Sequence, residues 1–384
     1  MYINFWYPMA TSEELEADKP LKVQAIGQSF VVFRDSEGKA NCLSNTCTHR
    51  GGALASGKVR GDCVQCPYHG WQFDGEGNCK KIPSLGSKAS IPARTRIDAY
   101  PVEERFGIVF AFLGDLPESE RPPLMDVPEY DKEGWRPTLQ HYSIVGNYER
   151  SIENGIDPAH NEYVHDTHGF SGEKEEEYKI GEMRIESAPD WAPWGNGFWH
   201  TFDAPPLPEG QMAEGRTQAG DLEVGTGHHG PNMVWTYIHA SETIWFHQYL
   251  FERPLDDGNI HLYLLCMRNG FLEEKNDSYM IERNQYVADQ DKVVIEDLRP
   301  VMTPATNTKE FMVPADKVIL MYREKLKEWD VKGWRIDTEE VERNRMKVAY
   351  AVPSPARREQ KGWVLDAIPL QTAEASKAEL KAAG

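Results

Sequence analysis

The sequence contains few cysteines and no apolar stretch long enough to cross a bilayer. Six cysteines in 384 residues are too few for a disulfide scaffold of this size. The longest apolar runs, such as residues 262–267, are much shorter than the roughly 20 residues that a membrane-spanning helix requires. The first residues also lack the basic and apolar segments of a secretory signal. We therefore expect a cytoplasmic protein with no membrane segment.

Basic residues are scarce as well. The chain has 42 Lys and Arg residues against 61 Asp and Glu residues, and the resulting net charge of −19 disfavours a nucleic-acid partner. Residues 1–115 carry 13 basic and 13 acidic residues, so the whole negative excess lies in the rest of the chain. This asymmetry favours two domains with different partners, although a solvated acidic surface would produce the same pattern.

Local sequence patterns also predict a division of the chain into two domains. Residues 1–115 alternate short runs rich in Val, Ile and Phe with glycine-containing turns, as in a small β domain. Residues 116–140 are dense in proline and charge and form the predicted linker. Residues 141–364 mix helix and strand patterns as a second domain, and residues 365–384 are a predicted tail. The expected strands of the first domain are Lys22–Ile26, Ser29–Arg34, Ala40–Ser44 and Gly107–Leu113.

Three patterns in the second domain carry further expectations. Asp316–Lys332 is amphipathic and predicts a helix. Residues 233–250 and 258–268 are predicted strands joined by a turn at 254–258. Tryptophan and phenylalanine are concentrated in residues 181–250, where they would either wall a pocket for a ring or fill a hydrophobic core.

Two cysteines and two histidines form the first chemical pattern. Cys47 and His49 make a C-x-H pair, and Cys66 and His69 follow as a C-x₂-H pair. Two thiolates and two imidazoles suit either zinc or a [2Fe–2S] cluster. The mixed order does not match the usual spacing of structural zinc sites, although a zinc site that uses the C-x₂-C of Cys63 and Cys66 stays open.

The residues around these ligands extend the pattern. Cys47–Gly51 (CTHRG) and Cys66–Trp71 (CPYHGW) are similar to the two ligand loops of Rieske-type oxygenases, and Phe5–Pro8 resembles their N-terminal start. The resemblance implies a Rieske [2Fe–2S] cluster in which Cys47 and Cys66 hold one iron and His49 and His69 hold the other.

A second cluster contains His160 and His165 with nearby carboxylates. Two histidines and one carboxylate are the usual ligands of mononuclear non-haem Fe(II), but an isolated histidine pair is more often structural. Five residues at about 100° each place the two histidines roughly 140° apart on an ideal α-helix, which is not one face. A π-type turn would bring them together.

The full string N-x₂-D-x₂-H-x₄-H, from Asn154 to His165, resembles the mononuclear-iron motif of the same family. The resemblance implies that His160 and His165 bind Fe(II). Asp157 would be a carboxylate that links His160 to His69 of a neighbouring subunit in a homotrimer, and Asn154 matches a nearby polar position. The third ligand lies downstream; Asp291 is preferred over Asp289, Glu296 and Asp297, and His168 is taken as a neighbouring residue rather than a ligand.

Together these motifs resemble the terminal oxygenase (alpha) component of the aromatic-ring-hydroxylating and O-demethylase Rieske oxygenases. The implied fold is α+β, with an N-terminal all-β Rieske domain followed by a catalytic domain whose antiparallel sheet is flanked by helices in a helix-grip, START-like arrangement. The implied activity uses O₂ and electrons to hydroxylate, dihydroxylate or oxidatively demethylate an aromatic or other cyclic small molecule.

Two other classes of function stay open at this point. A Rieske electron carrier needs only residues 1–115, and a zinc-stabilised binding protein would be colourless and redox-silent. No G-x-G-x-x-G follows a predicted strand, so an oxygenase would take electrons from a separate ferredoxin or NAD(P)H reductase. The sequence does not specify the substrate.

Overall fold

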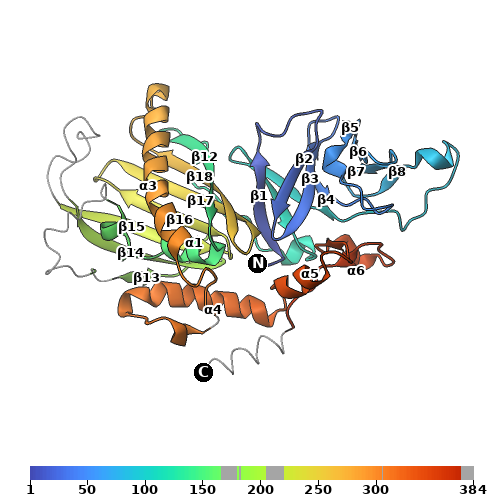
Figure 1. Cartoon of the computed structure of the whole chain (residues 1–384). Coiled ribbons are helices and arrows are strands. Elements are labelled where there is room, and N and C mark those ends of the chain that lie inside the picture. The colour runs from blue at the N-terminus through green and yellow to red at the C-terminus, as the bar shows by residue number, and fades with distance from the viewer. Residues whose placement is uncertain (166–179, 181–182, 205–219, 305, 373–384) are drawn as a thin grey trace. The chain divides into compact units, whose positions relative to one another are not determined.

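The computed structural model describes residues 1–165, 180, 183–204, 220–304 and 306–372, and it divides into two compact units. The first unit contains Met1–Pro123 together with Arg253–Asp257 and the described part of Trp329–Ser376. The second unit contains Leu124–Glu252 and Gly258–Glu328. Figure 1 labels many of the elements of both units.

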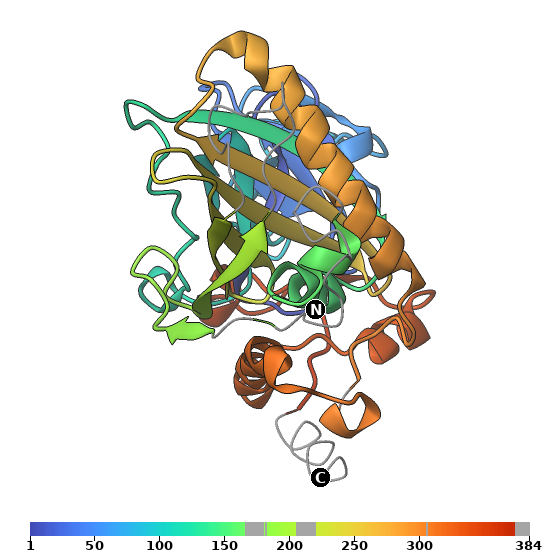
Figure 2. The ribbon, with the colours of Figure 1, turned by 90° about the vertical axis from the view of Figure 1, so that its left-hand side faces the viewer.

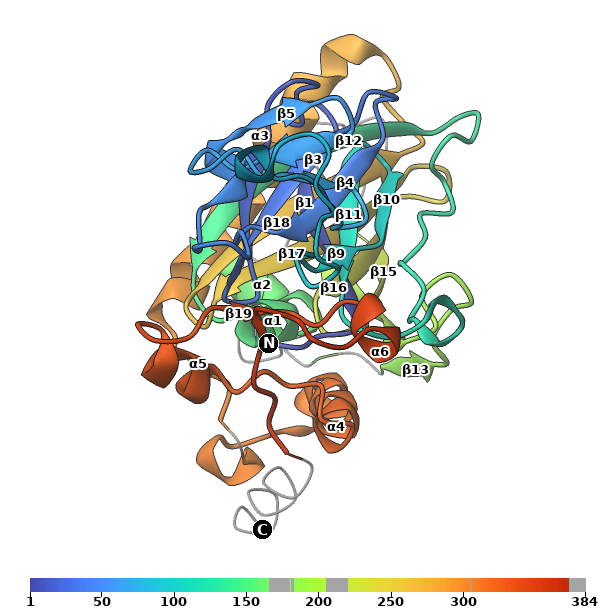
Figure 3. The same cartoon turned by 90° about the vertical axis from the view of Figure 1, so that its right-hand side faces the viewer.

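The first unit is built almost entirely from short antiparallel strands. Three small sheets have the orders β1-β11-β10, β2-β3-β4-β9 and β5-β6-β7-β8, and Figure 3 shows β3 and β4 side by side. The strands are β1 (Phe5–Thr11), β2 (Leu21–Ala25), β3 (Gln28–Arg34), β4 (Ala40–Ser44), β5 (Lys58–Arg60), β6 (Cys63–Gln65), β7 (Gln72–Asp74), β8 (Cys79–Lys81), β9 (Ala99–Tyr100), β10 (Val102–Arg105) and β11 (Ile108–Leu113). The four strands expected from the sequence are confirmed within one residue at each end.

The C-terminal part of the chain packs into this same unit. The Phe5 ring makes an edge contact with Trp329, at 4.8 Å between ring centroids, and Ile3 N donates to Trp334 O at 2.9 Å. The elements of this segment are α5 (Thr338–Asn344), β19 (Tyr350–Ala351), α6 (Ala356–Glu359) and β20 (Asp366–Ala367). Strands β19 and β20 pair in parallel.

The second unit is organised around one antiparallel sheet of seven strands. Its order is β12-β18-β17-β16-β15-β14-β13, and Figure 2 shows helix α3 lying across one face of it. The strands are β12 (Arg136–Val145), β13 (Arg184–Glu186), β14 (Gly195–Ala204), β15 (Gly220–His229), β16 (Met233–His239), β17 (Trp245–Asp256) and β18 (Asn259–Arg268). The helices are α1 (Tyr148–Gly155), α2 (Asn161–Val164), α3 (Asp277–Asp297) and α4 (Lys317–Val331). The α+β class expected from the sequence is confirmed.

One predicted strand was wrong. The stretch 233–250 is not continuous, because the chain turns between β16 and β17. The Ser241 hydroxyl accepts hydrogen bonds from the backbone N–H groups of Thr243 and Ile244 and closes that turn. Strand β17 then continues through Pro254 to Asp256, so the next turn is shorter than predicted. The amphipathic helix at 316–332 is confirmed as α4.

Strand alternation gives the large sheet two different faces. Thr236, Ile238, Gln248 and Leu250 line a cavity beneath α3. The residues between them point to the opposite face. There Tyr237 stacks on His247 with ring centroids 3.6 Å apart. Tyr237 and His247 therefore belong to an aromatic layer behind the cavity, whereas Tyr142 is an aromatic residue of the cavity wall.

Small residues make room for that aromatic layer. A Cβ atom added to Gly225 would lie 2.6 Å from the Trp199 ring, and one added to Gly227 would lie 2.6 Å from the Trp235 ring. Of the sequence-predicted aromatic set, the side chain of Phe202 lies outside the described residues. Trp191, Trp194, Phe198, Trp199, Trp235, Trp245 and Phe246 are all absent from the described lining of the cavity.

Candidate metal centres

Cys47 and Cys66 each begin a loop that closes in the same way. The Cys47 carbonyl accepts a hydrogen bond from Gly51 N at 2.9 Å, and the Cys66 carbonyl accepts one from Gly70 N at 3.0 Å. Both glycines have φ near +70°, which glycine adopts without steric cost. The sequence therefore folds into two similar loops, each carrying one cysteine and one histidine.

The ligands of the two loops differ in exposure. Both cysteines are buried, whereas His49 and His69 are exposed. The two imidazole rings lie with centroids 4.4 Å apart, and Trp71 stacks on His49 at 4.6 Å. The loops approach closely only because residue 52 is glycine, since a Cβ atom there would lie 2.9 Å from Cys66 Sγ.

The electrostatics of these loops fit a bound metal cluster. Burial, together with the neighbouring Cys66 sulfur, raises the pKa of the Cys47 thiol to about 12, so its thiolate requires a bound cation. Thr48 Oγ1 and Trp71 Nε1 are buried without a hydrogen-bond partner in the described part of the chain. Hydrogen bonds to cluster sulfurs would satisfy such donors. Cys63 lies in β6 instead, paired across the ladder with Asp74.

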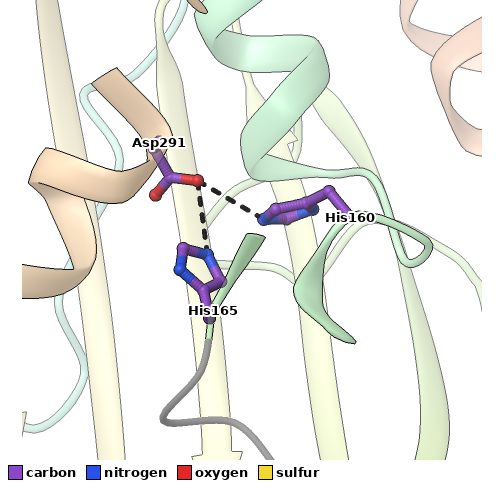
Figure 4. A group of neighbouring side chains, drawn as sticks. All are labelled: His160, His165 and Asp291. Atoms are coloured by element: carbon purple, nitrogen blue, oxygen red, sulfur yellow. Dashed lines mark ion pairs between the residues drawn. The ribbon is translucent and has the colours of Figure 1, made fainter. Parts of the chain in front are cut away.

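In the second unit, three side chains converge beside the cavity. His160, His165 and Asp291 each offer one ligand atom, and these atoms lie within 4.8 Å of one another. Figure 4 shows both imidazoles pointing at the same carboxylate. The Asp291 Oδ1 atom is 3.7 Å from His160 Nε2 and 3.3 Å from His165 Nε2. Two histidines and one carboxylate are the donor set of non-haem Fe(II) sites.

A one-turn helix and its two ends bring the histidines together. His160 precedes α2, and His165 leaves it with extended backbone, at φ −109° and ψ 108°. Val164 N donates to His160 O and His165 N to Asn161 O, which are i→i+4 bonds. The predicted π-type turn is therefore wrong. The 100° rule failed because His165 lies beyond the end of the helix.

The third member comes from the inward face of α3. Asn284, Ala288, Asp291 and Ile295 recur at helical spacing, and all line the cavity. Asp289 falls on the outer side of the helix, where it accepts a hydrogen bond from Gln285 at 2.8 Å.

The remaining candidates for the third ligand lie elsewhere. Glu296 accepts from Val145 N at 3.1 Å, and Asp297 ends the helix. His168 lies outside the described residues. The structure thus brings Asp291, among the four acidic candidates, to the two histidines.

Hydrogen bonds at the far side of each ring fix the orientation of the histidines. His160 Nδ1 is 2.7 Å from the Asp157 carbonyl oxygen, and His165 Nδ1 is 3.0 Å from Gln290 Oε1. Each Nδ1–H is therefore the donor to an oxygen, which leaves Nε2 with a lone pair for a metal. Burial lowers the pKa of His160, which also favours the neutral ring.

The Asp291 carboxylate lacks the partner that a buried carboxylate needs. Its Oδ1 atom is buried and accepts no hydrogen bond from the described residues. A buried carboxylate without a partner is costly, and a divalent cation would remove that cost. The donor types, the orientation of both rings and this unsatisfied oxygen all fit Fe(II).

The other predicted site residues lie at the same cavity. Asn154 and Asp157 both line it, and Asp157 Oδ1 accepts from Ala159 N at 2.8 Å. Sequence reasoning missed Gln290 and His200. His200 is buried in the cavity wall, and burial lowers its pKa to about 4. No sequence motif surrounds His200, so only its position on β14 reveals it as a cavity residue.

Comparisons with known proteins agree with this arrangement. Residues 5–101 match the Rieske [2Fe–2S] domain, and residues 144–331 match the vanillate O-demethylase oxygenase C-terminal domain. The chain belongs to the Rieske-type oxygenases. The family's cofactors are a Rieske [2Fe–2S] cluster and a mononuclear iron, and the two donor sets described above fit them. No helix in the described ranges is both long and apolar enough to cross a membrane.

Over the aligned region, individual relatives are identical to this chain at about a third of the positions. The toluene-4-sulfonate monooxygenase system iron-sulfur subunit of Comamonas testosteroni is 34% identical over 43% of this chain and 46% of its own length. The cholesterol 7-desaturase nvd 1 of Ciona intestinalis is 34% identical over 45% of this chain and 36% of its own length. These matches span less than half the length of either relative.

Solved structures share the fold across most of the chain. A crystal structure of dicamba monooxygenase bound to 3,6-dichlorosalicylic acid is 21% identical and covers 85% of this chain and 96% of that chain, with a TM-score of 0.70. The NdmA protein of Pseudomonas putida CBB5 with caffeine is 24% identical over 86% of this chain and 91% of that chain, with a TM-score of 0.67.

Proposed function

We propose that this chain is the terminal oxygenase component of an electron-transfer system. It takes electrons from a ferredoxin or an NAD(P)H reductase and uses O₂ to hydroxylate, dihydroxylate or oxidatively demethylate an aromatic or other cyclic small molecule. The observation that carries this proposal is the convergence of His160, His165 and Asp291 at the wall of a largely apolar cavity. An electron carrier does not bind a substrate and does not require such a cavity. A structural zinc site is closed by four protein ligands and does not open into a cavity.

Each proposed ligand has a defined task. Cys47, His49, Cys66 and His69 would hold the [2Fe–2S] cluster, and His160, His165 and Asp291 would hold Fe(II). When bound, the cluster supplies single electrons and the ferrous ion supplies the means to activate O₂.

The surrounding residues prepare the second site. The Asp157 carbonyl and the Gln290 amide keep both imidazoles aimed at one point. The aliphatic cavity wall holds a ring beside that point and limits the access of water. The exposed His49 and His69 leave the first site accessible to an electron donor.

We further propose a cytoplasmic homotrimer in which Asp157 links the two kinds of metal site of neighbouring subunits. Burial raises the pKa of the Asp157 carboxyl, and the hydrogen bond from the Ala159 backbone N–H, followed by the adjacent His160, opposes that rise. An Asp157→Asn variant is expected to keep both metals and the trimer yet lose most turnover. Normal turnover in that variant would remove the link from the proposal.

The central test is metal content matched with activity. The purified protein should contain about three irons and two labile sulfides per chain. His160→Ala should reduce iron by one per chain, leave the sulfide and visible spectrum unchanged, and abolish O₂-dependent product formation with an artificial reductase.

The matched control is His141→Ala, which removes an exposed histidine on β12 outside the described cavity lining. That variant should retain all the iron and full turnover. A colourless, zinc-containing protein would overturn the proposal, as would a His160→Ala protein that still forms product.

A further inference from the structure

A row of uncharged polar side chains crosses one wall of the cavity. Thr226 pairs with Thr236 across β15 and β16, and Thr236 pairs with Gln248 across β16 and β17. Asn284 on α3 extends the row, because Gln248 Nε2 donates to Asn284 Oδ1 at 3.2 Å. We call these four residues the polar row. The neighbouring cross-strand pairs that line the cavity are aliphatic: Val224 with Ile238, and Val234 with Leu250.

The two ends of the polar row differ in how well their hydrogen bonds are satisfied. Thr226 Oγ1 lies 3.0 Å from the Trp235 carbonyl and 3.2 Å from both the Gly155 carbonyl and Thr236 Oγ1, so its bonding capacity is used within the protein. The opposite end consists of the two carboxamides of Gln248 and Asn284, which make one hydrogen bond to each other.

The carboxamide end has unused hydrogen-bonding groups. Asn284 is 8% exposed, and its Nδ2 atom has no hydrogen-bond partner among the described residues. Asn284 would favour a Cys266 thiolate by donating to it, but burial raises the pKa of that thiol to about 11, so the thiol is neutral and a poor acceptor. No described residue donates to Gln248 Oε1. A buried amide left unpaired costs about as much as a lost hydrogen bond.

The number of free groups does not depend on how either amide is oriented. If both carboxamides were turned over, Asn284 would donate to Gln248 and the pair would still offer one carbonyl oxygen and one NH₂ group. The pair therefore presents an acceptor next to a donor in either case. A ligand with the complementary edge carries an N–H beside a C=O.

Resting on the proposed function, we propose that the substrate is an uncharged ring compound with a lactam-type edge, bound through Gln248 and Asn284. The ring N–H donates to one carboxamide and the ring C=O accepts from the other, while the aliphatic residues on either side contact the ring faces. An anionic edge at the same place would be buried against side chains without charge, which is costly. This makes Gln248 and Asn284 residues that determine specificity.

Binding to the iron-loaded protein, without reductant or O₂, tests the proposal independently of turnover. The probes are 2-pyridone and 2-quinolone, their N-methyl derivatives, and quinoline-2-carboxylate, each measured by calorimetry or equilibrium dialysis. At least one lactam should bind about tenfold more tightly than its N-methyl derivative, since the methyl group removes one hydrogen bond. The carboxylate should bind more weakly than 2-quinolone.

Variants locate the interaction. Asn284→Leu and Gln248→Leu should each weaken lactam binding about tenfold. The variant that removes the acceptor of the ring N–H should leave binding of the N-methyl derivative within twofold, whereas the variant that removes the donor to the ring C=O should weaken that binding as well. Gln285→Leu is the matched control, because Gln285 is the next residue on α3 and bonds to Gln140 and Asp289. That variant should bind all probes as the unaltered protein does. Iron content and the circular dichroism spectrum show whether each variant has folded.

The outcomes separate this proposal from the proposed function. Equal affinity for lactams and N-methyl derivatives, or lactam binding that survives both leucine substitutions, would overturn the assignment of the polar row. Turnover of ring compounds without any lactam preference would leave the oxygenase proposal standing while rejecting this one. Lactam preference without O₂ consumption would support the binding site and count against the oxygenase proposal.

Discussion

Four charged side chains form a cluster in the second unit, and removing one of them should be severely destabilising. Three of them, Arg150, Glu153 and Arg323, are buried, and Glu310 is half-buried. Arg323 on α4 makes two hydrogen bonds to the Glu153 carboxylate on α1, at 2.6 and 2.9 Å. Arg323 also contacts Glu310 at 2.7 Å, and Arg150 contacts Glu310 at 2.6 Å. Arg323 and Glu153 are 5% and 6% exposed, so neither charge has water as an alternative partner.

Arg323→Met would leave the Glu153 carboxylate buried without its main partner. Breaking such a pair costs about 3–5 kcal/mol, because an uncompensated charge remains in a poorly solvated site. For a folding unit of roughly 200 residues, each kcal/mol lowers Tm by about 2–4 °C, so a loss of about 6–20 °C is expected. The double variant Arg323→Met/Glu153→Met should recover most of this loss, since it removes both charges.

The pH dependence gives a second measure of the same effect. Burial already raises the pKa of Glu153, and Arg323 opposes that shift. Without Arg323 the folded-state pKa rises further above the unfolded value, so the folded state binds more protons. Stability of the variant should then fall as pH rises above the unfolded-state pKa of the carboxyl, and the defect should be smaller at the acidic end.

Scanning calorimetry at several pH values measures both effects. Lys327→Met, on the same helix, is the matched control, because Lys327 forms an exposed pair with Glu324 at 2.7 Å. It should change stability by less than about 1 kcal/mol. A loss below about 2 °C for Arg323→Met, or a double variant no more stable than the single one, would refute the reasoning.

Three further predictions concern single residues. Gln290→Leu should weaken iron binding about 10–100-fold, measured by chelator competition, because His165 loses the group that orients it; unchanged affinity would show that Gln290 does not orient the ring. Cys66→Ser should abolish the visible spectrum of the cluster, whereas Cys63→Ser should retain it with full labile sulfide; a colourless Cys63→Ser protein would revive the zinc interpretation. Burial raises the pKa of Glu252 to about 8, so unfolding free energy should fall by about 1.4 kcal/mol per pH unit between roughly pH 4.5 and 8, and this slope should be absent in Glu252→Gln.

The sequence alone predicts more of the geometry of the Rieske loops than of the iron site. For the Rieske loops, all four proposed ligands lie within 23 residues, and glycines at 51 and 70 set the turns that present them. Local sequence therefore contains nearly all the geometry. For the iron site, the chain supplies two histidines in one motif, but the carboxylate follows 126 residues after His165.

Helical spacing limited the candidates for the carboxylate ligand but did not select one of them. Asp289 and Asp291 belong to one helix, and either residue could have faced the histidines if the helix were rotated. The cavity-facing positions 284, 288, 291 and 295 become evident only when α3 packs across the sheet. The same packing brings Gln290 to His165, a contact for which the sequence contains no local signal.

The sequence by itself determined the chemistry of this protein: the cysteine–histidine loops, the paired histidines, and the β-rich start that distinguishes a Rieske domain from the rest of the chain. Those features depend on neighbouring residues and on short turns. The tertiary structure alone decided which carboxylate meets the histidines, which face of the sheet becomes the cavity, and which polar side chains are left unpaired there. These features depend on contacts between segments far apart in the chain, where packing of whole helices and strands, rather than local conformational preference, sets the distances.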